Sequence, residues 1–96
     1  MDAARFRLLP GWELVSRGLE DQAAGRETIE SLLLASANTR FARAGIPVTR
    51  PAGDVEWRLY ELIEREVGEA SAHGRYNALR RRLLSFLNTV DGARTG

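Results

Sequence analysis

The chain contains no cysteine, no lysine and only one histidine, and these absences exclude several kinds of chemistry. Without cysteine there is no disulfide, no thiolate zinc site and no cysteine nucleophile. Without lysine there is no Schiff-base nucleophile and no Walker-type phosphate lysine. A single His73 cannot supply a histidine-rich metal site, so we expect neither a metal nor another cofactor.

Long apolar runs and charge of one sign are missing as well. No apolar run approaches the roughly 20 residues that cross a bilayer, and residues 1–10 lack the apolar core of a signal peptide. The net charge is only +1, so no strong field draws the whole chain toward nucleic acid or a membrane. We therefore expect a soluble, cytoplasmic protein.

What is present indicates one small helical domain. The 96 residues leave no room for a second core, and an apolar fraction of 44% is typical of a globular chain. Between the nine glycines and three prolines, apolar residues recur at helical spacing. The sequence predicts an all-α fold over 1–96, a bundle of about four or five helices that ends in a helical hairpin.

The first residues allow more than one interpretation. Phe6 and Leu8 share one side at a period of two, which favours an extended arm over 1–10, although the same segment could belong to the core. Pro10 suits the first turn of a helix. A competing interpretation takes Pro10 and Gly11 as the turn between two strands.

Cap residues bound each expected helix. Asp54 is the best N-cap in the sequence and predicts a helix over 55–67 that ends before Gly68. The last helix, with the strongest apolar stripe, should begin between Ser71 and Tyr76 and fray over 91–96. The other expected elements are a helix over 12–24 ended by Gly25, a helix capped by Thr28, a short helix over 40–44 capped by Asn38 and ended by Gly45, and an extended linker over 46–53.

The charge distribution predicts how the last two helices pack. Residues 54–69 carry six acids and two arginines, whereas residues 70–96 carry five arginines and one aspartate. We expect the two helices to lie antiparallel, with Arg75 and Arg80–Arg82 facing the glutamates. Exposed ion pairs contribute only about 0–1 kcal/mol each, so these pairs would set register more than stability.

Catalytic constellations are absent from the sequence, and we expect no enzyme. There is no Gly-x-Ser-x-Gly elbow and no phosphate-binding glycine loop, and Ser71 points away from His73 on a helix. The densest polar cluster is a candidate anion or ligand site near the start of the last helix, where free N–H groups favour an anion. Its residues are His73, Arg75, Tyr76 and Asn77, although Ser71 as a cap, Tyr76 in the core and a solvated His73 would explain the same pattern.

Some large apolar residues do not fit the stripes of an internal core. Trp57 lies on the side of its helix opposite the core face, together with Glu61 and Glu64, and Tyr60 lies between the two faces. Trp57 could alternatively fold back on Pro47 or Pro51. Leu34, in a run of three leucines, and Leu84 also fall outside the main stripes, and a chain this short cannot easily surround a central helix.

These observations predict a non-catalytic protein–protein interaction or accessory module. Trp57, Tyr60, Leu34 and Leu84 are its candidate interface, and a homodimer is the first expected partner. The alternative is a small nucleic-acid-binding protein that uses Arg75, Arg80, Arg81 and Arg82, extended by Arg40, Arg43 and Arg50. A helix-turn-helix through 28–44 would present only Arg40 and Arg43 to a groove.

Overall fold

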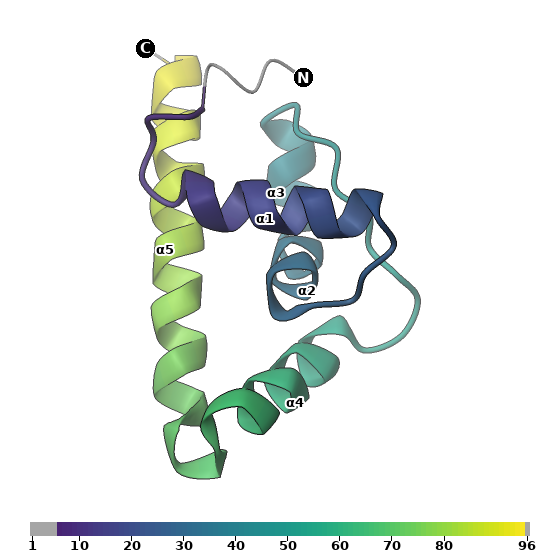
Figure 1. The fold of residues 1–96 in the computed structure, drawn as a ribbon. Helices are drawn as coiled ribbons and strands as arrows, with labels where there is room; N and C mark the ends of the chain where they lie inside the picture. Colours follow the sequence, from purple (N-terminus) through teal and green to yellow (C-terminus); the bar gives the residue numbers. More distant parts are fainter. Residues whose placement is uncertain (1–5, 96) are drawn as a thin grey trace.

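The computed structural model of the chain describes residues 6–95, and the side chains of residues 6–92. Within this range it contains helices and no strand, which confirms the predicted all-α class (Figure 1). The helices are α1 (Trp12–Ala23), α2 (Ile29–Ser36), α3 (Asn38–Arg43), α4 (Val55–Val67) and α5 (Glu69–Thr95). None of the described helices is long and apolar enough to cross a membrane.

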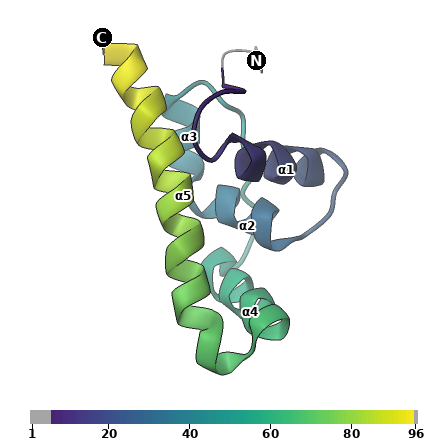
Figure 2. The same cartoon turned by 60° about the vertical axis from the view of Figure 1, so that its left-hand side comes forward.

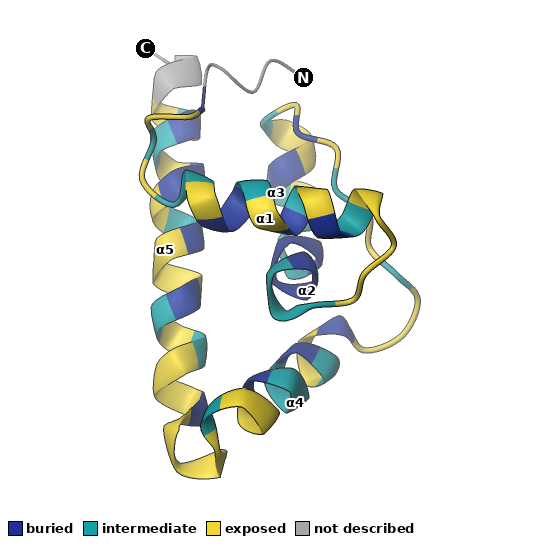
Figure 3. Ribbon diagram, in the orientation of Figure 1, coloured by how far each residue is buried: buried dark blue, intermediate teal, exposed yellow. Residues whose placement is uncertain are grey.

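Helix α2 is the centre of the fold. α1 lies across it, α4 packs against it, and α5 runs along one side of the whole assembly (Figures 1 and 2). Leu32, Leu33, Leu34 and Ala35 are all 0–1% exposed, and no residue of α2 is in the exposed class (Figure 3). The expectation that a chain of this length cannot surround a central helix is therefore wrong, because α2 is short enough to be covered by its neighbours.

A glycine permits the closest of these contacts. A Cβ atom added at Gly18 of α1 would lie 2.5 Å from Leu34 Cδ1 and 2.9 Å from the carbonyl oxygen of Glu30. Only a residue without a side chain lets the two helix backbones approach this far. Gly18 therefore allows Leu34 to be fully buried.

The predicted caps of α1 and α2 are confirmed. Gly25 ends α1 in the left-handed conformation, at φ 73°. Its N–H donates to Gln22 O at 3.1 Å, and the next N–H, of Arg26, donates to Asp21 O at 2.8 Å. Thr28 opens α2 in a capping box with Ser31. The turn between the two helices is thus closed by backbone and side-chain hydrogen bonds together.

Asp21 ties the end of α1 to the start of α2. Its carboxylate accepts hydrogen bonds from the Thr28 hydroxyl at 2.7 Å and from Arg26 Nε at 3.0 Å. The hydrogen bond from Thr28 is the main reason that the pKa of Asp21 lies below its ordinary value, with a further contribution from Arg26. The ionised carboxylate therefore stabilises this turn.

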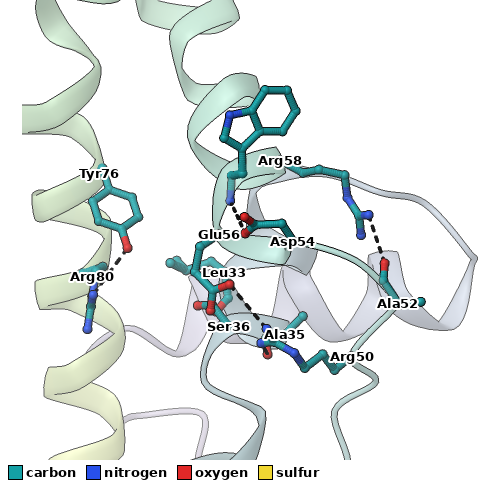
Figure 4. Close-up of polar contacts among 11 residues, drawn as sticks. Leu33, Ala35, Ser36, Arg50, Ala52, Asp54, Glu56, Arg58, Tyr76 and Arg80 are labelled. Atoms are coloured by element: carbon teal, nitrogen blue, oxygen red, sulfur yellow. Dashed lines mark hydrogen bonds and ion pairs between the residues drawn. The ribbon is translucent and has the colours of Figure 1, made fainter.

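The extended linker over 46–53 is present and is held in place by long side chains. Gln22 forms two hydrogen bonds with the backbone of Thr49, one from Nε2 to the carbonyl at 3.0 Å and one from Thr49 N–H to Oε1 at 2.9 Å. Arg50 donates to Ala35 O at the end of α2, and Arg58 of α4 donates to Ala52 O (Figure 4). These contacts fix where α4 begins.

For the N-terminal segment, the alternative that it belongs to the core holds for Phe6, whereas the other predictions are wrong. Pro10 lies before the N-cap Gly11 and not in the first turn of α1. Residues 6–11 form consecutive turns, with Leu9 N–H donating to Phe6 O at 3.0 Å, and they form neither an extended arm nor a strand. Phe6 is buried against Trp12 and Phe86, whereas Leu8 is 98% exposed, so the two residues do not share one side. The predicted arm over residues 1–5 lies outside the described residues.

The C-terminal hairpin is present, but its bounds and contacts differ from the prediction. α5 begins at Glu69, directly after Gly68 (φ 87°), and it continues past Asp91 to Thr95. A single glycine is enough to reverse the chain, so no longer connection separates the helices. The start of α3 is also earlier than predicted, since Asn38 is its first residue and provides no side-chain cap.

The expected ion pairs between α4 and α5 are not formed among the described residues. The two helices diverge from the turn at Gly68 (Figure 1), and they meet through Tyr60 and Tyr76, whose ring centroids are 5.7 Å apart. Arg82 instead pairs with Glu13 of α1. Packing against α2 sets the angle of α4, and the small free energy of exposed ion pairs does not override it.

Replacing Gly18 by Ala should destabilise the fold by about 1–3 kcal/mol, because the new methyl group overlaps Leu34 and the α2 backbone. Gly74 provides the matched control, since it lies within α5 with nothing within 4 Å of an added Cβ. Gly74→Ala should stabilise by about 0.5–1 kcal/mol through helix propensity. Urea unfolding of both variants measures these changes, and equal effects would contradict the close crossing of α1 and α2.

Replacing Asp21 by Asn should make the free energy of unfolding less dependent on pH in the acid range. A lowered pKa means that ionised Asp21 stabilises the fold above its unfolded pKa of about 3.9, and that this stabilisation disappears as pH falls through the folded pKa. Asp21→Asn should therefore be less stable than wild type at neutral pH, and the difference should shrink below about pH 4. Thermal unfolding of the wild type and of Asp21→Asn across this pH range tests the prediction, with Glu20→Gln, at an exposed position, as the control. A difference in stability that stays constant with pH would refute it.

Candidate functional site

The most exposed aromatic residue of the described chain is Trp57, with 63% of its surface accessible. It is the third residue of α4, and its backbone N–H donates to Asp54 Oδ1 at 2.9 Å, so the predicted N-cap directly positions it (Figure 4). A side chain this exposed is not folded back on Pro47 or Pro51, which was the alternative that the sequence left open. Trp57 faces solvent from a fixed helical turn.

Trp57 lies in a shallow groove on the outer face of α4. The groove is lined by Trp57, Tyr60, Glu61 and Glu64, and we call it the α4 groove. These positions are spaced i, i+3, i+4 and i+7, so they form one stripe along the helix. Tyr60 is half-buried and its ring packs on Tyr76, which ties one wall of the groove to α5.

The α4 groove is acidic, and its two carboxylates differ. Glu61 accepts a hydrogen bond from Arg65 at 2.7 Å, an i, i+4 pair on the same helix. Glu64 is exposed and forms no ion pair or hydrogen bond with any of the side chains over residues 6–92. An uncompensated negative charge therefore lies about two helical turns along α4 from the exposed indole.

The structure does not bring the four predicted interface residues together. Leu34 is fully buried against Gly18, so it belongs to the core and to no surface of the folded chain. Leu84 is half-buried and lies in a separate hollow between α2, α4 and α5, where Tyr76 and Arg80 also lie. Only Trp57 and Tyr60 remain as one surface.

The predicted anion cluster is dispersed around α5. His73 and Asn77 contact each other at 3.2 Å on the exposed face, whereas Tyr76 packs on Tyr60. Arg75 lies elsewhere, in a crevice between α1, α2 and α5. Because α5 begins at Glu69, these residues also lie beyond the free N–H groups of its first turn.

The crevice around Arg75 is a feature that the sequence did not indicate. Its charged residues are Arg17, Arg75 and Arg82 with Glu13 and Glu30, over a floor of Leu14 and Leu79. Arg82 is held by Glu13, whose pKa is lowered by its own backbone N–H and then by Arg82. The crevice holds two acids against three arginines, and Glu13 pairs with Arg82, so part of its positive charge is balanced locally.

The arginines of α5 whose side chains are described do not form one basic face. Arg75 and Arg82 face α1, whereas Arg80 donates to the Tyr76 hydroxyl at 3.3 Å and lies 5.7 Å from the Tyr76 ring centroid. Arg81 projects in a third direction, at about 100° per residue. Such a distribution does not favour binding along a nucleic-acid backbone.

The segment over residues 28–44, considered above as a helix-turn-helix, is also unsuited to binding in a groove of DNA. α2 is buried, and Arg40 of α3 is held against α5 by hydrogen bonds to Asp91 at 2.8 Å and Asn88 at 2.9 Å. Arg40 is therefore not free to contact a base. The described part of α3 leaves only Arg43 exposed to solvent among its arginines.

No protein-family model, curated protein or solved structure matches this chain. The described residues include no group of three or more histidine or acidic side chains arranged to hold a metal ion. The function must therefore be inferred from the exposed residues themselves, and the α4 groove is the feature with the clearest chemistry.

Proposed function

We propose that this chain is a non-catalytic protein-interaction module that binds its partner through the α4 groove. The observation that carries this proposal is the exposure of Trp57, at 63%, beside a core that is otherwise closed. Tryptophan is among the residues that contribute most to protein interfaces, because its large ring loses much apolar surface from water on binding. A partner that covers Trp57 would gain this free energy.

The position of Trp57 supports the same conclusion. The leucines of α2 are buried, so the exposed indole does not result from an overfilled core. Asp54 fixes the turn that carries Trp57, and Tyr60 is fixed by its contact with Tyr76. A surface that is already ordered loses little conformational entropy when it binds.

A second copy of the chain is the first candidate partner. The prediction of a homodimer rests now on the α4 groove alone, since Leu34 is internal. Light scattering on a sizing column at micromolar concentration should give a mass near twice 10.7 kDa if the groove mediates self-association. A strict monomer at every concentration would remove the dimer and leave a different protein as the partner.

Replacing Trp57 by Ala should weaken binding strongly without unfolding the chain. Because the side chain is largely exposed, we expect a stability change within about 0.5 kcal/mol. Loss of an interface tryptophan should weaken binding by about 2 kcal/mol or more, roughly thirtyfold. A sizing column measures self-association, and quantitative affinity capture by the immobilised full chain measures binding of another protein. Circular dichroism measures folding.

Leu8→Ala is the matched control, because Leu8 is 98% exposed and lies outside the α4 groove. This variant removes an exposed apolar side chain and should leave both self-association and capture unchanged. If Trp57→Ala and Leu8→Ala behave alike, or if Trp57→Ala unfolds the chain, the groove is not the docking surface.

A further inference from the structure

We infer that the α4 groove binds a cationic side chain, arginine or lysine, presented by a basic segment of a partner protein. This inference rests on the proposed function, since it specifies the chemistry of the partner that docks there. It follows from the combination of an exposed indole with carboxylates in one stripe of α4.

The aromatic wall of the groove suits a cation. A guanidinium or ammonium group over the face of a tryptophan or tyrosine ring is attracted by the negative face of the ring. The same hairpin already contains one such contact, with the Arg80 guanidinium 5.7 Å from the centroid of Tyr76. Trp57 has more ring surface than Tyr76 and leaves it open to solvent.

The carboxylates determine which partners are excluded. An apolar partner that covered the groove would remove water from Glu64 without providing a hydrogen-bond donor, and an acidic partner would be repelled. Glu61 is already engaged by Arg65, whereas Glu64 has no partner among the described residues. One cationic side chain of a basic segment would contact the indole, and a second, farther along the groove, would neutralise Glu64.

The length of the groove limits how much of the partner it holds. Residues i to i+7 span about 10 Å of helix, at about 1.5 Å per residue. This length accommodates one or two side chains, which matches basic residues three or four apart on a helix. The partner segment is therefore expected to be short.

The test uses the full chain and two synthetic peptides. One is an alanine-rich helical peptide of about 15 residues with arginines at i, i+4 spacing, and the other has glutamine in place of each arginine. Calorimetry measures the dissociation constants, and NMR follows the indole N–H signals of Trp57 and Trp12. The arginine peptide should bind at least tenfold more tightly, shift the Trp57 signal alone, and weaken as salt is raised.

Variants of α4 identify the responsible groups. Glu64→Gln should weaken binding of the arginine peptide about fivefold, whereas Glu66→Gln, about 180° from Trp57 around the helix, should not change it. Glu64→Arg should abolish binding of the arginine peptide and favour a peptide with glutamate at the same positions. Trp57→Ala should abolish binding of every peptide.

The outcomes separate this inference from the proposed function. If the arginine and glutamine peptides bind equally and both need Trp57, protein docking at the groove stands and the selection of a cation is wrong. If neither peptide shifts the Trp57 signal, the cation inference is overturned. The proposed function fails if Trp57→Ala unfolds the chain, or if it leaves self-association and protein capture unchanged.

Discussion

The fold depends on the close crossing of α1 over α2 at Gly18. α2 has apolar residues around most of its circumference, so it must be covered on several sides at once. A short chain achieves this only if the covering helices approach closely. Gly18 permits that approach on one side, where an added Cβ would overlap Leu34.

A second glycine, Gly11, has the same role at the start of α1. Gly11 adopts φ 82°, and a Cβ there would lie 2.7 Å from the carbonyl oxygen of Arg82. α1 can therefore lie against α5 at its start and against α2 at its middle. The aromatic residues Phe6, Trp12 and Phe86 fill the space beside this contact.

The burial of α2 changes the reason for proposing a partner. The sequence indicated a surplus of apolar surface that one copy could not hide, but the structure hides nearly all of it. What remains is Leu8, in the turns before α1, and Trp57, whose exposure arises from its position in the first turn of α4. The case for a docking surface therefore rests on where one residue lies and on the charges beside it.

The features that could be predicted from the sequence are local. The caps at Thr28 and Asp54 and the turn at Gly25 depend on hydrogen bonds between residues a few positions apart, and helical periodicity alone placed Trp57 opposite the core face. The contacts that could not be predicted join distant segments. Glu13 and Arg82 are 69 positions apart, and their pairing depends on the crossing angles of whole helices.

Hydrogen exchange of the α2 amides tests most directly whether one chain buries its own central helix. The amides of Leu32–Ala35 should exchange only by global unfolding, as slowly as the most protected amides of α1 and α5. Faster exchange in α2 than in α1 and α5 would show that α2 opens without the rest of the fold, and it would contradict the burial of the central helix by its own chain.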